Sequence, residues 1–544
     1  MDDVGAGEPL SRAAADALGD ADALRLLAEL VAIAPTNLED PLHGRYEKPR
    51  YRRAADRIVR AARDRGLATR LFDPVVDGPP APELRGIPRP NVVIDLDVGA
   101  PKTVLILAHY DVVPVPVEQL GRWKSPPHTL TYRSNGRLYG RGSNDDLGSG
   151  VVASLLAMQR MAAGPAPPAN VRLLACCDEE TGGAGGVERL KAHDEALPEE
   201  DPSRFLRGEV ALIPDGSPHA TAGSSGLVFL DASFGTVPTL TETLRYGTTL
   251  IALHDLAKTW KSVYRSPDWP DHGAPEPVVT GRATLTKFDI DPTPAVPGAA
   301  FVVAAHAETD AANQIAQSVT VVFGGDGTAV EAAVRGLEAD VRPPFTVVPA
   351  AGTALQVPAS ARAVQVVGVS AHGGYPHRGA NPVPECLRLL ELASRAGRIS
   401  SDHRSAATFS VDLRLLPEME LAAGRDVVLS TLRATLATSL PTARAEAPEI
   451  RARGGYHLSP THPMVLHLER LCADLFGAPG VFGEYGGTDA SSLEGLRTPA
   501  GAPLPALVFG SMDRESHIHE AEESADPREI AKVATLLERF VREG

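Results

Sequence analysis

The sequence predicts an α/β protein whose main domain is a mixed, largely parallel sheet between helices, interrupted by an inserted α+β domain with antiparallel strands. Continuously apolar, strand-like runs alternate with amphipathic helical runs from residue 21 to about residue 225. Between residues 226 and 455 the strand-like runs alternate apolar and polar residues instead. The first pattern returns over residues 456–544, so residues 1–225 and 456–544 are expected to build one domain together.

The first part of the main domain reads as alternating helices and buried strands. Apolar residues at three- and four-residue spacing predict helices, and unbroken apolar runs predict strands covered on both faces. In order, the expected elements are helices over 21–34 and 51–65, strands over 91–98 and 103–109, a helix over 149–164, a strand over 171–177, a helix over 185–197 and a strand over 209–214.

The inserted domain and the returning segment complete the expected fold. Alternating strands are predicted over 226–235, 282–290, 317–325, 346–352, 363–374 and 407–416, with helices over 382–397 and 424–440. A loop is expected over 266–277. In the returning segment a helix over 462–477, a buried strand over 505–510 and an amphipathic helix over 526–543 are predicted.

Composition excludes several classes of function. The chain has 544 residues and a formal net charge of -16, which repels phosphate backbones and argues against nucleic acid as a partner. The first 20 residues are acidic without an apolar core, and no run is long enough to span a bilayer. Four cysteines without Cys-x-x-Cys spacing predict reduced, buried thiols. We therefore expect a soluble, cytoplasmic protein with no membrane partner.

Acids and imidazoles follow several of the predicted strands. Ligands of open α/β sheets bind beyond the carboxyl ends of the strands. Each residue alone has a structural explanation, as a turn residue, a helix N-cap or part of a solvated loop. Together they suggest cations, because clustered carboxylates repel one another without them. The residues are His109, Asp111, Asn144, Asp145, Asp146, Asp178, Glu179, Glu180, Asp215, His517 and His519.

The donor types indicate which cations fit. Imidazole mixed with carboxylate suits Zn²⁺, with Co²⁺ or Mn²⁺ as alternatives, better than Mg²⁺ or Ca²⁺. Two such ions need one bridging carboxylate and about two terminal ligands each. Two imidazoles and three carboxylates match that number, and a further carboxylate is left over as a base.

The chain resembles the di-zinc metallopeptidase family of carboxypeptidase G, aminoacylase, acetylornithine deacetylase, succinyl-diaminopimelate desuccinylase and carnosinase-like dipeptidases. Single motifs would be weak, but they occur in the family's order between about residues 104 and 523. They are LAHYDVVPV, LYGRGSNDDLGSG, CDEETGG, LIPDGS, VGVSAHGGYPHRGANP, VDLRLLP, GGTDAS and HIHEAEE.

The resemblance implies a set of metal ligands. His109 and Asp215 would bind one metal, Glu180 the other, and Asp145 would bridge the two. Asp111 would hold the His109 imidazole through its second ring nitrogen.

The last ligand comes from the C-terminal motif, a histidine followed four residues later by glutamate. His519 has Glu523 at that offset whereas His517 has Ala521, so His519 is expected to be the ligand and His517 is the alternative.

The resemblance also implies the chemistry. A hydroxide held by both metals would attack an amide carbonyl, with Glu179 as general base and His372 of the inserted domain donating to the oxyanion. Arg414 could clamp a substrate carboxylate or form an ion pair with Asp412; the sequence leaves both open. Asn381 is a further candidate contact to substrate, whereas Asp489 is expected to order a loop without a catalytic role.

Two hydrolase functions follow from this resemblance. The first is a dipeptidase or exopeptidase, and the alternative is an N-acyl-amino-acid deacylase that removes acetyl or succinyl groups with the same ligands. The family's usual lysine is replaced by Leu147, and the insert is long for the family. An insert of this size resembles the branch whose lid supplies the histidine within one chain, so a monomer suffices, although the lid of other members pairs two subunits into a homodimer.

Overall fold

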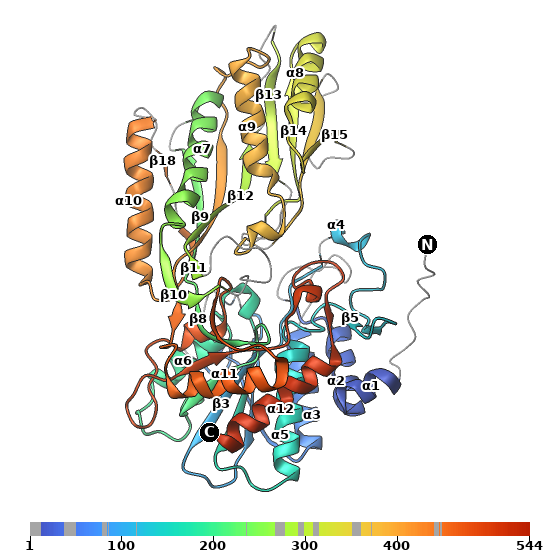
Figure 1. The fold of residues 1–544 in the computed structure, drawn as a ribbon, viewed down its shortest axis with the longest axis vertical. Helices are drawn as coiled ribbons and strands as arrows, with labels where there is room; N and C mark the ends of the chain where they lie inside the picture. The colour runs from blue at the N-terminus through green and yellow to red at the C-terminus, as the bar shows by residue number, and fades with distance from the viewer. Residues whose placement is uncertain are drawn as a thin grey trace. The chain divides into compact units, whose positions relative to one another are not determined.

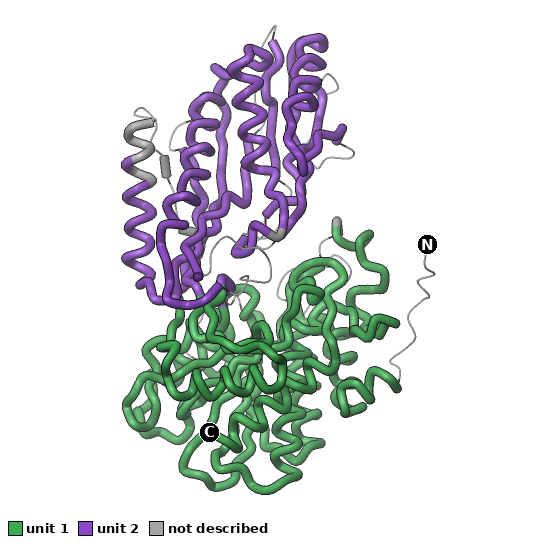
Figure 2. The backbone as a smooth tube through the Cα atoms, in the orientation of Figure 1, with its two compact units in different colours: residues 1–224, 456–484, 488–544 green, residues 225–455, 485–487 purple. Residues whose placement is uncertain are grey.

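The computed structural model divides the chain into two compact units, which are drawn in different colours in Figure 2. Unit 1 contains residues 1–224, 456–484 and 488–544, and unit 2 contains residues 225–455 and 485–487. The structure describes residues 12–36, 50–78, 84, 86–115, 117–234, 237–266, 278–291, 299–307, 315–350, 361–371, 373–439, 445–446 and 449–544.

Unit 1 is built on a mixed sheet (Figure 1). Its strands follow the order β1-β2-β6-β3-β7-β22-β8-β21. Its centre is parallel, because β3 pairs in parallel with both β6 and β7, and β7 with β22. The strands are β1 Ala68–Phe72, β2 Asn91–Leu96, β3 Thr103–His109, β6 Asn170–Cys176, β7 Val210–Ile213, β8 Ala220–Ser224, β21 Val481–Glu484 and β22 Ala506–Val508, with β20 Tyr456–His457 pairing β8. The continuous apolar runs of the sequence are the buried parallel strands.

Helices cover this sheet on both faces. The helices of unit 1 are α1 Arg12–Leu18, α2 Ala21–Ile33, α3 Arg50–Asp64, α4 Val117–Leu120, α5 Ala153–Ala163, α6 Val187–Glu195, α11 Pro463–Phe476 and α12 Pro527–Glu543. On one face the apolar side of α6 packs onto Leu105, Leu107 and Leu174 of the sheet. The C-terminal helix α12 contacts α5 and α1, so the two ends of the chain share one core.

A small three-stranded sheet joins the middle of unit 1 to its C-terminal part. β5 Leu138–Tyr139 pairs with β4 Thr131–Tyr132 on one side and with β23 Ser524–Ala525 on the other. This pairing places the segment that follows β5 beside the loop that precedes β23.

Unit 2 is a nine-stranded sheet of antiparallel pairs with order β15-β16-β14-β13-β12-β17-β9-β18, where β19 also pairs β9. The strands are β9 Leu227–Phe234, β12 Arg282–Ile290, β13 Phe301–Ala307, β14 Ser318–Gly324, β15 Thr346–Pro349, β16 Arg362–Val367, β17 Ala407–Arg414, β18 Ala445–Glu446 and β19 Glu449–Arg453. Two further strands, β10 Lys261–Arg265 and β11 Val278–Thr280, pair antiparallel with each other outside this nine-stranded sheet. Its helices are α7 Leu240–Ala257, α8 Gly327–Asp340, α9 Pro382–Arg395 and α10 Leu421–Ser439, and one large core lies between them and the sheet (Figure 1).

The predicted fold class is confirmed: a mixed α/β sheet is accompanied by a second, antiparallel α+β sheet. The four cysteines are free and buried, as expected. The expected helix over 149–164 differs at its start, where a π-helical turn, Leu147–Val152, precedes α5. The expected strand over 363–374 ends early at Val367, and most of the expected loop over 266–277 lies outside the described residues. Among the helices that the structure describes, every one is too short or too polar to cross a membrane.

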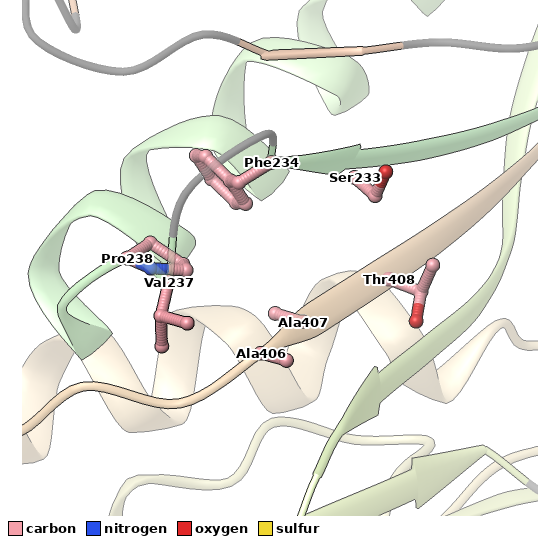
Figure 3. A pocket seen from close by; sticks show the side chains of 7 residues that line it. All are labelled: Ser233, Phe234, Val237, Pro238, Ala406, Ala407 and Thr408. Atoms are coloured by element: carbon pink, nitrogen blue, oxygen red, sulfur yellow. The ribbon is translucent and has the colours of Figure 1, made fainter.

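A small cavity of about 260 Å³ opens beside the ends of β9 and β17 in unit 2 (Figure 3). Apolar side chains such as Phe234, Val237 and Pro238 line most of it, and the polar lining groups are the hydroxyls of Ser233 and Thr408. Without an ionisable side chain, the cavity provides neither metal ligands nor acid–base groups.

Replacing Gly186, the residue before α6, with alanine is expected to lower the free energy of unfolding by about 1–3 kcal/mol. The reason is a collision, because a Cβ atom there would lie 2.1 Å from the carbonyl oxygen of Cys177. Gly121→Ala is the matched control, since a Cβ at Gly121 meets nothing within 4 Å. The midpoints of urea unfolding of the two variants measure the difference, and equal midpoints would contradict the prediction.

Candidate metal centre

Three neighbouring parallel strands bring the predicted site residues to one edge of the unit 1 sheet. His109 is the last residue of β3 and pairs in register with Cys176, the last residue of β6. Glu179 and Glu180 follow β6 directly, and Asp215 follows β7. Because the carboxyl ends of parallel strands meet at the same sheet edge, residues more than 100 positions apart become neighbours.

Two of these side chains join Asp145, from the segment after β5, and His519, from the loop before β23. The four form an acid–imidazole cluster, which we define as His109, Asp145, Glu180 and His519. The two oxygens of Asp145 face different imidazoles: Oδ1 lies 3.3 Å from His109 Nε2, and Oδ2 lies 2.9 Å from His519 Nε2. His519 Nε2 also lies 3.1 Å from Glu180. One ligand atom each from His109, Asp145 and Glu180 lies within 4.8 Å of the others, so these groups can hold a divalent metal ion.

Asp111 has more contacts than the sequence suggested. The His109 Nδ1 atom lies 3.0 Å from the main-chain oxygen of Asp111 and 3.6 Å from its carboxylate. The carboxylate accepts hydrogen bonds from the main-chain N–H groups of Glu179, at 3.1 Å, and Glu180, at 3.2 Å. Asp111 is fully buried, so it orients one imidazole and the turn that carries two glutamates. The sequence contains no signal for these main-chain bonds.

Asp178, the residue before the two glutamates, also fixes their turn through its side-chain hydrogen bonds. This residue has a left-handed backbone, φ 62°, and its carboxylate is nearly fully buried. One oxygen accepts from the Tyr51 hydroxyl at 2.9 Å, and the other accepts from Arg89 Nε at 2.6 Å. Asp178 is thus a structural support for Glu179 and Glu180 that sequence reasoning counted only among the acids at the strand ends.

The site concentrates buried negative charge. Burial raises the pKa of Asp146 and Asp215 well above the usual range, and the neighbouring carboxylates add to this rise while His109 opposes it. Burial also raises the pKa of Glu180 to about 7, against the lowering effect of His519. Imidazole nitrogens with several buried carboxylates are the donors that Zn²⁺ prefers, and a bound cation would compensate their charge. The residues present therefore fit a divalent metal centre.

The two candidate C-terminal histidines occupy different surroundings. His517 is half exposed and lies 3.7 Å from Glu520, away from the other candidate ligands. His519 points its Nε2 atom at Asp145 and Glu180. The structure thus brings His519, and not His517, into the acid–imidazole cluster.

Two candidate residues of unit 2, Arg414 and Asn381, have structural partners. Arg414 is buried and pairs with both carboxylate oxygens of Asp412, at 2.6 and 2.7 Å, and its Nη1 atom donates to the Tyr485 carbonyl. Asn381 caps helix α9 by accepting from the Val383 N–H, and its amide donates to the Leu285 carbonyl. His372 lies outside the described residues. The clamp, the substrate contact and the oxyanion donor therefore stay predictions.

Known proteins resemble this chain in sequence. The family described as Peptidase family M20/M25/M40 matches residues 105–543. Succinyl-diaminopimelate desuccinylase of Acidovorax ebreus is 43% identical over 105 residues, 18% of this chain and 26% of that protein. The Cys-Gly metallodipeptidase dug1 of Schizosaccharomyces pombe is 36% identical over 135 residues, 24% of this chain and 26% of that protein. The matched stretches thus span about a quarter of each of these relatives.

Two solved structures share the fold along nearly the whole chain. Human carnosine dipeptidase 1 has a TM-score of 0.53 with 14% identity and covers 96% of both chains. The dipeptidase Dug1p of Saccharomyces cerevisiae has a TM-score of 0.57 with 12% identity and covers 97% of both chains. The family match includes every segment that supplies the acid–imidazole cluster, and it confirms the resemblance predicted from the motifs. The chain belongs to the peptidase family M20/M25/M40.

Proposed function

We propose that the protein hydrolyses an amide bond in small peptides, as a dipeptidase or exopeptidase, at a two-metal centre in unit 1. The observation that carries the proposal is the Asp145 carboxylate, which directs one oxygen to each of two imidazoles. That is the arrangement a carboxylate needs to bridge two cations. His109 and Asp215 would complete the ligands of one cation, and His519 and Glu180 those of the other.

The mechanism assigns each residue a task. Two divalent cations, when bound, supply the Lewis acidity that lowers the pKa of a water and polarises the scissile carbonyl. Glu179 would take a proton from a water as its oxygen adds to the scissile carbonyl, and would pass that proton to the amine nitrogen as the carbon–nitrogen bond breaks. Asp111 and Asp178 hold the turn that carries Glu179, which keeps its carboxylate in place between the two proton transfers. His372 would donate to the oxyanion, and unit 2 would act as the lid that contains it.

Zinc is the metal we propose, with cobalt or manganese as alternatives, because two imidazoles and three carboxylates form a mixed donor set. The protein would act in the cytoplasm, where its four free, buried cysteines stay reduced. A monomer suffices if His372 acts within its own chain, and a homodimer is the alternative.

The second candidate function is removal of an acyl group, such as acetyl or succinyl, from an N-acyl amino acid. It is favoured by the match to succinyl-diaminopimelate desuccinylase, and the ligands would be the same. Turnover of a panel of dipeptides, with N-acetyl and N-succinyl amino acids as the comparison, separates the two functions. Hydrolysis of the acyl compounds alone would replace the peptidase proposal with the deacylase.

Removal of metal is expected to abolish hydrolysis of every substrate in this panel. The protein as purified should contain about two metal ions per chain, as two-metal sites require. Dialysis against a chelator should remove both the metal and the activity, and added Zn²⁺ should restore both. Metal content is measured by elemental analysis, and turnover is measured on the same samples. Full activity in metal-free protein would refute the proposed mechanism.

A further inference from the structure

A buried carboxylate four residues after His519 connects two of the segments that supply the acid–imidazole cluster, the loop of His519 and the loop of Asp145. Glu523 is fully buried, and its Oε1 atom accepts main-chain N–H groups from Gly142 at 3.0 Å, Asn144 at 3.3 Å and Asp145 at 3.4 Å. Its own carbonyl oxygen accepts from the Gly140 N–H at 3.0 Å. The segment that ends at Asp145 is therefore held by hydrogen bonds to a single residue, Glu523, which lies in the same loop as His519.

Within the part of the chain that the structure describes, the charge of Glu523 pairs with Arg141. Arg141, which is also fully buried, donates from Nη1 to the second oxygen, Oε2, at 2.7 Å. The two oxygens thus have separate partners. Oε2 forms the ion pair with Arg141, and Oε1 accepts hydrogen bonds from the main chain of the segment that contains Asp145. The ion pair uses Oε2, so it does not explain why Oε1 accepts three main-chain N–H groups.

We propose that Glu523 is a positioning residue of the metal centre, whose Oε1 atom sets the distance between the Asp145 carboxylate and the His519 imidazole. The inference rests on the proposed function, since it assigns a role toward the same two cations. The structure supports it through covalent connection: Glu523 follows His519 by four residues, and it binds the main chain of Asp145 itself. Groups that orient metal ligands typically change metal affinity about 10–100-fold when they are replaced.

The test compares two double variants of the full chain that both remove the buried ion pair. Arg141→Met with Glu523→Gln keeps an oxygen that can accept the main-chain N–H groups. Arg141→Met with Glu523→Met removes that oxygen but keeps a similar shape. Replacement of a buried ion pair by apolar groups is often tolerated, so both metal-free proteins are expected to fold. Glu522→Gln is the control, since Glu522 pairs with Arg133 and is the same residue type one position earlier.

Zinc affinity by chelator competition and the absorption spectrum of the Co²⁺ form are the readouts, and unfolding of the metal-free proteins is measured separately. The glutamine double variant and Glu522→Gln should keep wild-type affinity and spectrum. The methionine double variant should bind about 10–100-fold more weakly, with a changed cobalt spectrum. If it does not fold, Glu523→Asp, which withdraws the carboxylate by one methylene, should give the same loss.

The outcomes separate this inference from the function on which it rests. Equal affinity of the two double variants, or wild-type affinity in Glu523→Asp, would overturn the positioning role, because the Oε1 atom would then be dispensable. A wild-type protein that fails to bind two metal ions would instead overturn the proposed two-metal centre.

Discussion

Replacing Glu179 with glutamine is expected to lower kcat by about 10²–10⁴-fold, the usual contribution of a general base, while two metal ions stay bound. Glutamine has the shape of glutamate but accepts no proton at neutral pH. The main-chain N–H of residue 179 would still donate to Asp111, so the turn should keep its conformation. Turnover of the best substrate from the panel and elemental analysis of the same sample measure the two quantities.

The control for this variant is Glu195→Gln, at the exposed end of helix α6, which should keep wild-type kcat. A fall in kcat together with loss of metal would show that residue 179 contributes to metal binding instead of proton transfer. Retained kcat would remove Glu179 from its proposed role. The two measurements together therefore distinguish a base from a ligand.

Much of the unit 1 fold could be predicted because its central strands are continuously apolar. Buried parallel strands such as β3 and β6 require such runs, and the helices that cover them show three- and four-residue periodicity. The strand order could not be predicted, since β22 comes from the end of the chain and inserts between β7 and β8. Such long-range pairing depends on tertiary packing and leaves no local pattern.

The site shows the same division between local and long-range information. Ordered motifs identified His109, Asp145 and Glu180 as candidates, and the structure places these three together. Apart from the expected contact between Asp111 and the His109 imidazole, the supports behind them escaped prediction, because they are bonds between side chains and distant main-chain groups. Asp111 binds N–H groups 68 and 69 residues away, and Glu523 binds groups about 380 residues away. A sequence motif identifies a candidate metal ligand, but it does not identify the distant residue whose hydrogen bonds orient that ligand.

Unit 2 is where sequence reasoning remains most open. The VDLRLLP motif allowed Arg414 to be a substrate clamp or the partner of Asp412, and the structure contains the ion pair. A guanidinium with two nitrogens on one carboxylate and a third on the Tyr485 carbonyl has a structural task already. A substrate carboxylate would have to compete with Asp412 for the Arg414 guanidinium, and the VDLRLLP motif carries no information about that competition.

Replacing Asp145 with asparagine is expected to remove at least one of the two metal ions and to lower kcat/KM by an amount on the order of 10²–10³-fold. The structure gives the reason: each oxygen of Asp145 faces a different imidazole, so each would bind a different cation. Asparagine keeps the shape but has one oxygen, and its NH₂ group binds no metal. A metal contributes several kcal/mol of charge stabilisation in the transition state, and each 1.4 kcal/mol corresponds to a factor of ten.

The measurement that separates lost metal from lost fold is the response of thermal stability to zinc. A metal that binds only the native state raises the melting temperature, and tighter binding at a given concentration raises it further, so Zn²⁺ should raise the Tm of the wild-type protein. The rise in Tm should be smaller for Asp145→Asn than for the wild-type protein. It should equal the wild-type rise for Asp64→Asn, a change at the exposed end of helix α3. If Asp145→Asn binds two zinc ions with an undiminished rise in Tm, Asp145 does not bridge them. The two cations would then need a different shared ligand, and Asp215 or Glu180 would be the next residue to replace.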